Sequence, residues 1–357
     1  MNDRVLKCAV VGLGRIGWQF HIPQILKNPG FELTAVVDPD PERLAEAQQK
    51  FGLQLVCRTC EEIPTGTVDL AVISSPTRFH CIQTLYFLEH GMDVFCDKPI
   101  ALSLQESRYM VETARRLERK LMVYQPHRLS SECLGAKAIL ESGKLGSPYM
   151  FSRYSSNFCR RNDWQAFYAN GGGMLFNYGA HYIDQMFYLS KDSSERVKCE
   201  LRRVLSLGDA DDVVRALITG KSGILYDLNI NMASALPLPA LILYGTLGTA
   251  ELQPDNSWKL RYCRAEELPP IAMQTGLSAK GRKYPSETLP WREEVMPEIP
   301  EDLTEYYRIC YDYYARDSKP FVPPEQTLEV MRTLELCRNN AAENRVLNNL
   351  PIEGIIL

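Results

Sequence analysis

The sequence predicts an α/β protein in two parts: an N-terminal domain on a doubly wound parallel sheet, and a C-terminal α+β domain on a large, mostly antiparallel open sheet. Its 357 residues exceed the roughly 250–300 that one hydrophobic core usually organises. Apolar strand-like runs alternate with helical segments up to about residue 125 and follow one another after it. We therefore predict a first domain over 1–125 and a second over 126–357.

The first 125 residues show the alternation of strand and helix that parallel sheets need. Expected strands are 6–11, 33–37, 68–74, 93–96 and 121–124, and expected helices are 18–27, 41–50, 79–89 and 103–119. The helix stops are readable, since Asn28-Pro29-Gly30 ends one helix and Gly91 ends another. Strands joined through helices of this length predict right-handed βαβ units, with helices on both faces of the sheet.

The second part has consecutive strands, which favours antiparallel pairing. Expected strands are 149–154, 197–204, 213–219, 224–232, 241–244 and 249–252. Gly220-Lys221-Ser222-Gly223 reads as a hairpin loop between two of them, since glycine supplies the positive φ of such turns. Helices over 133–142 and 180–189 would cover one face of this sheet. The other face is then free for a second subunit, and we expect a homodimer or homotetramer.

A stretch rich in proline precedes the last two expected helices. Pro285, Pro290, Pro297 and Pro300 predict loops there. Helices over 304–315 and 326–344 close the chain, and they can pack back on the first domain.

Composition excludes several classes of protein. There are 40 basic and 44 acidic residues, a net charge of −4, and no basic stripe, so nucleic acid is not an expected partner. No segment approaches the ~20 apolar residues of a membrane span, and the N-terminus lacks the pattern of a secretory signal. We expect a cytoplasmic protein without a membrane partner.

The cysteines and histidines do not form a metal-binding pattern. Cys57 and Cys60 make a C-x-x-C, which on its own is typical of a redox pair or half a zinc site. No second C-x-x-C or Cys/His pair completes a ligand set among the 11 cysteines and 5 histidines. We predict reduced thiols and no metal.

The segment Gly12-Leu13-Gly14-Arg15-Ile16-Gly17 is a G-x-G-x-x-G directly between the first strand and the first helix. In that position the glycines allow a tight turn, close approach to a pyrophosphate and helix packing, while the helix N-terminus attracts the phosphates. Asp38 follows at the end of the second strand, where a carboxylate can accept hydrogen bonds from ribose hydroxyls. The alternative is a tight turn without a ligand. Together these features predict a Rossmann dinucleotide site.

Asp38 also bears on the choice between NAD and NADP. A carboxylate there repels the 2′-phosphate of NADP and accepts the free hydroxyl of NAD, so NAD is the favoured cofactor. Arg15 and Arg43 keep NADP open, because an arginine turned inward can pair with that phosphate.

Asp97-Lys98-Pro99 stands at the carboxyl end of an expected parallel strand, where open α/β sheets present ligand-binding residues. The Lys98 ammonium can hydrogen-bond a substrate oxygen, and burial or a cationic neighbour can lower its pKa. The alternative is a surface lysine before a structural proline.

A triple glycine, Gly171 to Gly173, precedes a polar constellation. If the segment from Met174 is helical, Asn177, His181 and Asp184 share one face. Histidine is a good general base for a hydroxyl proton, and Asp184 could orient the imidazole or bind substrate. The alternative for His181 is a satisfied structural residue.

Eight segments, in this order, resemble the glucose-fructose oxidoreductase/inositol dehydrogenase (Gfo/Idh/MocA) family over nearly the whole chain. They are Gly12 to Gly17, Val36-Val37-Asp38-Pro39, Ser75-Pro76-Thr77-Arg78-Phe79-His80, Asp97-Lys98-Pro99, Gln125 to Arg128, Gly143-Lys144-Leu145-Gly146, Asp163-Trp164 and Gly171 to Asp184. The resemblance implies a Rossmann domain, a C-terminal sheet used for oligomerisation, and bound NAD or NADP.

The resemblance also implies roles for single residues. Lys98 and His181 would carry catalysis, with Asn177 at a position commonly occupied by aspartate. The cofactor site would comprise Gly12, Gly14, Arg15, Ile16, Gly17, Asp38, Ser75, Pro76, His80, Asp97, Lys98 and Gln125. The substrate cleft would comprise Lys98, Arg128, Arg160, Arg161, Trp164, Tyr168, Asn177 and His181. For Arg160 and Arg161, a solvated loop is the alternative.

Two positions depart from the family pattern. The motif usually reads Glu-Lys-Pro, and Asp97 is one methylene shorter, so its reach to the nicotinamide ribose differs. Asn177 cannot ionise, which leaves His181 or Lys98 as the base.

Three functions agree with these residues. The first is a dehydrogenase or reductase that moves a hydride between a nicotinamide cofactor and a hydroxyl or keto carbon of a sugar or polyol. The second uses transiently reduced NAD for elimination or hydrolysis without net redox change. The third is a non-catalytic NAD-binding sensor.

Overall fold

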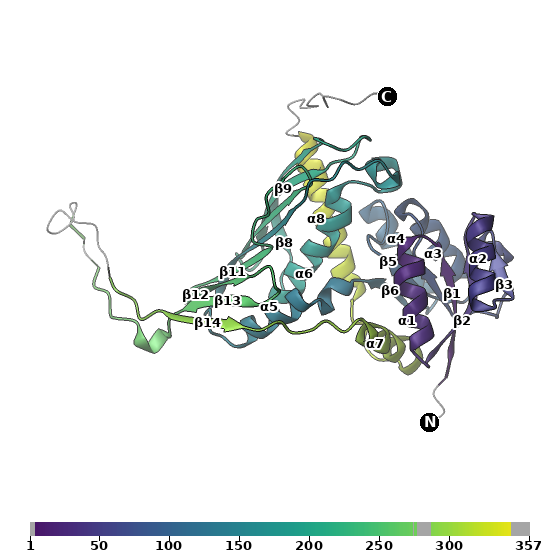
Figure 1. Cartoon of the computed structure of the whole chain (residues 1–357), viewed down its shortest axis with the longest axis horizontal. Coiled ribbons are helices and arrows are strands. Elements are labelled where there is room, and N and C mark those ends of the chain that lie inside the picture. Colours follow the sequence, from purple (N-terminus) through teal and green to yellow (C-terminus); the bar gives the residue numbers. More distant parts are fainter. Residues whose placement is uncertain (1–3, 274, 277–286, 344–357) are drawn as a thin grey trace.

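The computed structural model describes residues 4–273, 275–276 and 287–343, and in them the chain forms two sheets with helices between (Figure 1). Pro285 of the proline-rich stretch and Asn344, the expected end of the last helix, lie outside the described residues. None of the described helices is both long and apolar enough to cross a membrane.

The first sheet is parallel and has the order β3-β2-β1-β4-β5-β6. Its strands are β1 Leu6–Val11, β2 Phe31–Val37, β3 Leu55–Cys57, β4 Leu70–Ile73, β5 Asp93–Asp97 and β6 Leu121–Tyr124. The strand order reverses between β1 and β4, and open α/β sheets bind ligands outside the carboxyl ends of the strands at such a point. The expected strands are confirmed, and β3 is an addition of three residues.

Helices on both sides of this sheet match the expected ones. They are α1 Ile22–Lys27, α2 Pro41–Phe51, α3 His80–Glu89 and α4 Leu104–Arg116. Local chemistry sets the ends of α2: the Asp40 side chain accepts a hydrogen bond from Glu42 N, and Gly52 takes φ 65° just past the last turn. The residues before α1, Gly17–His21, form a π-helical turn.

The second sheet has eight strands in the order β14-β13-β12-β11-β7-β10-β9-β8. They are β7 Pro148–Ser156, β8 Ser194–Arg202, β9 Val213–Gly220, β10 Leu225–Asn231, β11 Leu241–Gly245, β12 Gly248–Leu252, β13 Trp258–Tyr262 and β14 Arg292–Met296. All neighbours pair antiparallel except β7 with β10. The hairpin at 220–223 is confirmed by the β9–β10 pairing.

β13 and β14 were not expected from the sequence. β14 lies within the proline-rich stretch that predicted only loops, and its residues Arg292, Glu293 and Glu294 are charged. It is an edge strand, so charged side chains at solvent-facing positions cost little there.

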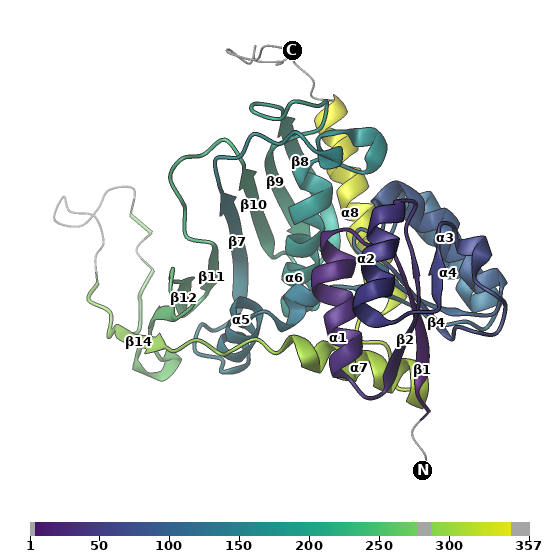
Figure 2. The same ribbon diagram turned by 45° about the vertical axis from the view of Figure 1, so that its right-hand side comes forward.

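Helices α5 Ser131–Glu141, α6 Ala180–Ser190 and α8 Pro324–Glu343 stand between this sheet and the first one, and the opposite face of the sheet is open (Figure 2). Alternation along β9 agrees, since Val214, Ala216 and Ile218 are fully buried whereas Leu217 is 42% exposed.

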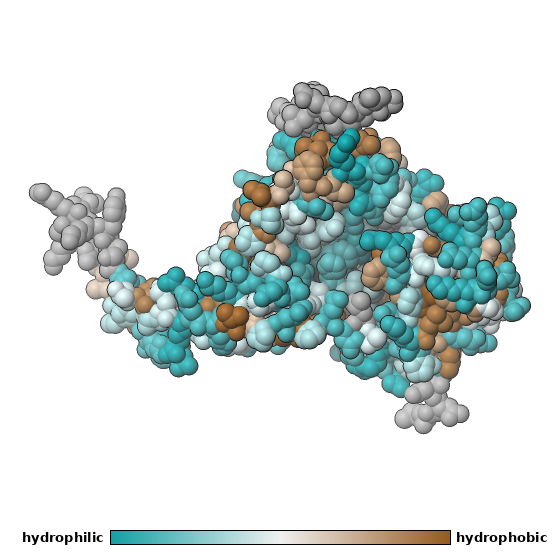
Figure 3. Space-filling view, viewed as in Figure 1, coloured by the Kyte–Doolittle hydropathy of each residue, from teal (hydrophilic) through white to brown (hydrophobic). Residues whose placement is uncertain are grey.

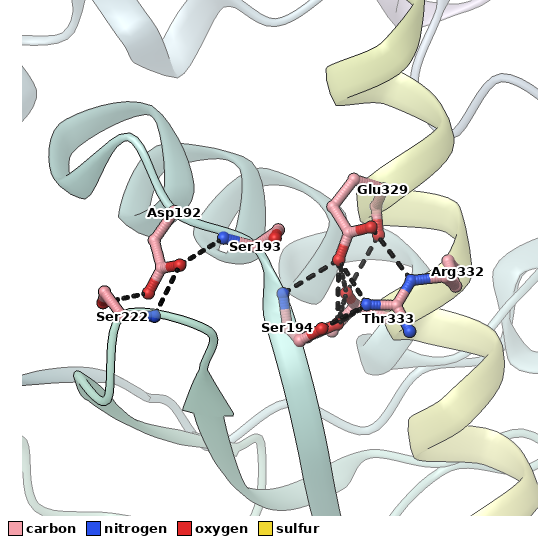
Figure 4. A network of polar contacts seen from close by, with 7 residues as sticks. All are labelled: Asp192, Ser193, Ser194, Ser222, Glu329, Arg332 and Thr333. Atoms are coloured by element: carbon pink, nitrogen blue, oxygen red, sulfur yellow. Dashed lines mark hydrogen bonds and ion pairs between the residues drawn. The ribbon is translucent and has the colours of Figure 1, made fainter.

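The last two described helices pack in different places. α7 Leu303–Arg316 packs its tyrosines into the apolar cluster of the first sheet, through Tyr306, Tyr307, Tyr311 and Tyr314. α8 also contacts the first part of the chain, through α4 and β6, and it packs along β8 of the second sheet. There Glu329 Oε1 accepts hydrogen bonds from Ser194 N and Ser194 Oγ, both at 2.9 Å, beside a second cluster in which Asp192 accepts from Ser193 and Ser222 (Figure 4).

Candidate active site

The turn after β1 has the shape that its glycines predict. Gly12 has φ +95°, and a Cβ there would lie 2.6 Å from Ser75 N. A Cβ on Gly17 would lie 2.1 Å from Gly12 O, whereas one on Gly14 would meet nothing within 4 Å. The first and third glycines are thus required by the protein itself. The second faces open space, which leaves room for a dinucleotide phosphate.

Asp38 closes the other side of this turn. Its side chain is buried and accepts hydrogen bonds from Leu13 N at 2.7 Å and Asp40 N at 3.0 Å. Arg43 Nη1 lies 3.5 Å from Asp38 Oδ2. The carboxylate is therefore fixed beside the glycine turn, and it retains lone pairs for another donor.

The residues predicted from the loop after β4 differ in what they can contact. Ser75 lies against Gly12, and its Oγ donates to Gln83 Oε1 at 2.6 Å. His80 is 1% exposed, and its two ring nitrogens face Pro99 O at 2.9 Å and Ser75 O at 2.8 Å. Burial lowers the pKa of His80, and the one N–H of the neutral ring can donate to only one of these two carbonyl oxygens, so its contact with the cofactor stays a prediction.

Lys98, just past β5, points toward the second domain. Its Nζ donates to Asn177 O at 2.8 Å and to Asn177 Oδ1 at 3.0 Å. An ammonium has three N–H groups, so one is left without an acceptor among the described residues. Burial lowers the pKa of Lys98 to about 8; Asp97 opposes this shift, and Arg15 and Arg161 add to it.

Asp97 is itself buried, which raises the pKa of its carboxyl group to about 6 against the effects of Lys98 and Arg15. Its Oδ1 accepts from Lys98 N at 2.7 Å.

The triple glycine builds the wall behind Asn177. Gly171 and Gly173 have φ of +80° and +98°, and a Cβ on Gly172 would lie 2.2 Å from Gln165 O. The loop thereby packs against the short helix Trp164–Ala166. Gln165 Oε1 accepts from Asn177 Nδ2 at 3.2 Å and from Arg161, which turns Asn177 Oδ1 toward Lys98. Gln165 was missed in the sequence, where nothing marks it apart from its place beside Asp163-Trp164.

The helix that follows begins with a π-helical turn, Leu175–Gly179, before α6. π-turns of this kind are frequent at functional sites. It brings His181 to the same region as Lys98, and His181 Nδ1 lies 3.3 Å from Gln125 Oε1. With Gln125 Oε1 as the acceptor of this contact, Nδ1 carries the proton of the neutral ring and Nε2 keeps its lone pair. Burial, followed by the charge of Lys98, holds the pKa of His181 well below its usual value.

Asp184 and Arg128 do not have the predicted roles. Arg128 Nε and Nη2 donate to the two Asp184 oxygens at 2.8 and 2.6 Å, and the two residues are each 2% exposed. Asp184 therefore neither orients His181 nor reaches substrate, and Arg128 is withdrawn from the cleft. Helical spacing correctly put Asp184 on one helix with His181, but a buried carboxylate needs a buried cation as partner.

The other predicted cleft residues lie on the loop between β7 and the triple glycine. Arg160 and Trp164 are exposed, and Arg161 pairs with Asp163 at 3.0 Å. Tyr168 turns toward Asp211, and burial raises its pKa. The surface between the two halves of the molecule is hollowed and mostly hydrophilic (Figure 3).

Two other features bear on ligand binding. A cavity of about 520 Å³ lies between α1 and α7, lined by Lys27, Pro29 and Tyr311 among others, and none of the site residues above lines it. Across the described ranges, no group of three or more His, Cys, Asp or Glu side chains could hold a metal ion.

Family models match both halves of the chain. Residues 6–125 match the model described as "Oxidoreductase family, NAD-binding Rossmann fold", and residues 134–251 match "GFO/IDH/MocA C-terminal domain".

Individual relatives agree with the family models. D-glucoside 3-dehydrogenase of Escherichia coli is 30% identical over 196 residues, which are 53% of this chain and 55% of that protein, so the match spans about half of that relative. scyllo-Inositol 2-dehydrogenase (NAD(+)) of Bacillus subtilis is 24% identical over 98% of this chain and 97% of its own. An NAD-binding protein from Listeria innocua has a TM-score of 0.84 at 25% identity, over 96% of this chain and 99% of its own. The chain belongs to the Gfo/Idh/MocA oxidoreductase family, whose first domain is an NAD-binding Rossmann fold.

Proposed function

We propose that this protein is an NAD-dependent dehydrogenase or reductase that transfers a hydride between the nicotinamide and a hydroxyl or keto carbon of a sugar, cyclic polyol or sugar derivative. One observation carries the proposal: a lysine with one uncommitted N–H stands beside a neutral histidine with a free ring nitrogen. The names of the E. coli and B. subtilis relatives support the substrate class.

Each side chain has a separate role in the proposed reaction. Bound NAD would supply the acceptor for the hydride that leaves the carbinol carbon. His181 Nε2 takes the hydroxyl proton, so the alcohol loses a hydride and a proton and becomes a ketone. The third N–H of Lys98 hydrogen-bonds the oxygen on which negative charge develops. Asn177 acts by holding Lys98, because its amide does not exchange a proton at neutral pH.

We assign the proposed cofactor and substrate contacts from the positions of these residues around the turn after β1 and the loop after β7. The turn from Gly12 to Gly17 would hold the pyrophosphate, with Arg15 nearby, and Asp38 would accept from the adenosine ribose. Ile16, Ser75, Pro76, Asp97 and Gln125 would complete the cofactor site. Arg160, Arg161, Trp164 and Tyr168 would line the substrate side, where an arginine can pair with a carboxylate or phosphate group.

Asp38 leads us to propose NAD over NADP. The 2′-phosphate of NADP would meet a buried carboxylate already committed to two backbone N–H groups. Arg43, 3.5 Å away, offsets part of that charge. Titration of the protein with each cofactor at moderate salt decides the point, and tighter binding of NADP would refute it.

A substrate screen tests the activity itself. The purified protein is incubated with NAD and a series of sugars, inositols and sugar acids, and with NADH and their keto forms, while absorbance of the reduced nicotinamide is followed. Net accumulation or consumption of NADH supports the proposal. Product formation without net NADH would identify the elimination or hydrolysis reaction instead, and NAD binding without any turnover would identify a sensor.

A further inference from the structure

A second histidine lies against the proposed base. His127 belongs to the short 3₁₀ helix Pro126–Leu129 that follows β6, and its ring stacks on that of His181 with centroids 4.0 Å apart and an interplanar angle of 17°. Of the His127 side chain, 34% is exposed. The stack therefore forms one wall of the site. His127 lies in the segment Gln125 to Arg128 that carries part of the family resemblance, but no role for it was predicted from the sequence.

One edge of the His127 ring, at Nδ1, lies near the charge pair of Glu132 and Arg153. Its Nδ1 is buried without a hydrogen-bond partner and lies 3.9 Å from Glu132 Oε1. Glu132 accepts from Arg153 at 2.7 and 2.9 Å and from Gln185 Nε2 at 3.1 Å. The acid is thus held still, close to His127.

Burial and the neighbouring cations Lys98 and Arg153 oppose a proton on His181, whereas the Glu132 carboxylate favours one on His127. Burial lowers the pKa of His127 to about 4; Glu132 raises it, and Lys98 and Arg153 lower it. The pKa of His181 is lowered by burial, then by Lys98, by His127 and by Arg153. Two rings at this separation cannot both carry a charge at low cost, because like charges in a buried site repel strongly.

We propose that His127 is a positioning residue for His181: its stacked ring fixes the plane of the imidazole so that Nε2 faces the substrate oxygen. Gln125 sets the tautomer from the ring edge, and His127 sets the orientation from the ring face. The kinetic part of this inference rests on the proposed dehydrogenase reaction. The effect on the imidazole of His181 does not.

The experiment compares His127→Phe, which keeps a flat ring, with His127→Ala, which removes it. His90→Ala is the matched control, because His90 is also stacked, on Tyr86 with centroids 4.1 Å apart, but at the exposed end of α3. In wild type, nuclear magnetic resonance of the histidine rings should show a neutral His181 with its proton on Nδ1. His127→Ala should shift the His181 ring signals and raise the pKa of His181, because loss of the stacked ring exposes one face of the imidazole to water, whereas His127→Phe keeps that face covered.

The kinetic arm separates positioning from folding. His127→Ala should lower kcat by about 10- to 100-fold, the scale expected when a catalytic group is misplaced by about an ångström, while NAD affinity and Tm stay near wild type. His127→Phe should recover kcat to within about threefold of wild type.

Three results would overturn the proposal: an unchanged His181 signal in His127→Ala, wild-type kcat in that variant, or an equal loss in His127→Phe. If wild type turns over no substrate, the proposed function fails while the resonance experiment still decides the effect of His127 on His181.

Discussion

At the scale of single residues, the site depends on how the Lys98 ammonium and the His181 imidazole are held in place. Lys98 Nζ is bound twice by Asn177, and His181 is bound at one edge by Gln125. Each residue taken alone has an ordinary structural interpretation. Their convergence, with lowered pKa values for both Lys98 and His181, is what favours catalysis.

The first prediction concerns these two side chains. Lys98→Ala and His181→Ala should each lower kcat by roughly 10²–10⁴-fold, the usual range for general acid–base assistance, with little change in NAD affinity. Asn177→Ala should cost less, because it only holds Lys98. Steady-state kinetics on a confirmed substrate, with NAD binding measured separately, is the test. Near-wild-type turnover in both of the first two variants would end the proposed mechanism.

The second prediction uses the amide at position 177. Asn177→Asp would place a carboxylate at the position from which Oδ1 now accepts from Lys98 at 3.0 Å. An opposite charge favours the ammonium and should raise the pKa of Lys98 by roughly 1–3 units from its value of about 8. Because the proposed donor is the protonated form, activity falls as pH rises through this pKa.

The alkaline limb of the kcat/KM profile in Asn177→Asp should therefore move to higher pH. A limb that stays in place or moves down would show that Lys98 does not act as a protonated donor. Asn177→Gln is the matched control, since it changes the side chain without adding charge.

At the scale of elements, one glycine of the turn after β1 is required by backbone packing, and another leaves space for a ligand. Gly17 cannot accept a Cβ, which would lie 2.1 Å from Gly12 O, whereas a Cβ on Gly14 meets nothing within 4 Å. The two glycines of one motif should therefore respond differently to the same substitution.

The third prediction follows from this contrast. Gly14→Ala should leave Tm near wild type and weaken NAD binding, since the added methyl occupies the open face of the turn. Gly17→Ala should lower Tm as well, because the clash involves backbone atoms. Thermal unfolding and NAD titration of both variants check it. Unchanged NAD affinity in Gly14→Ala would mean that the phosphate lies elsewhere.

At the scale of the whole molecule, the second sheet leaves one face open (Figure 2). Leu217 on that face is 42% exposed, and Val295 on the edge strand β14 is 67% exposed. Beyond that edge, Ile271 and Met273 are 78% and 88% exposed. Exposed apolar side chains toward both ends of this sheet favour its burial against another subunit.

The fourth prediction is that the protein is a homodimer or homotetramer through this face. Sedimentation at micromolar concentration should give a mass that is a multiple of the chain mass. Leu217→Lys should shift the population toward monomer, and Tyr109→Lys, an exposed position on α4, should not. A wild-type protein that sediments as a stable monomer would rule out the assembly.

Much of the fold could be predicted because local sequence patterns determine most of its helices and strands. The periodicity of apolar residues and the helix stops at Asn28-Pro29-Gly30 and Gly91 identify most of the elements, since these signals act within a few residues. β3 and β14 were missed for a related reason: a three-residue strand and a charged edge strand carry little periodic signal, and only pairing with a neighbour stabilises them.

The sequence by itself determined the class of fold, the dinucleotide turn and the two side chains, Lys98 and His181, on which the proposed chemistry rests. Tertiary structure alone decided which side chains meet: Asp184 with Arg128, Gln165 with Asn177, and His127 with His181. Spacing along a helix places a residue on a face, but the partner comes from another element. Burial makes that partner necessary, because a charge or lone pair removed from water must be satisfied by whatever polar group the fold brings near.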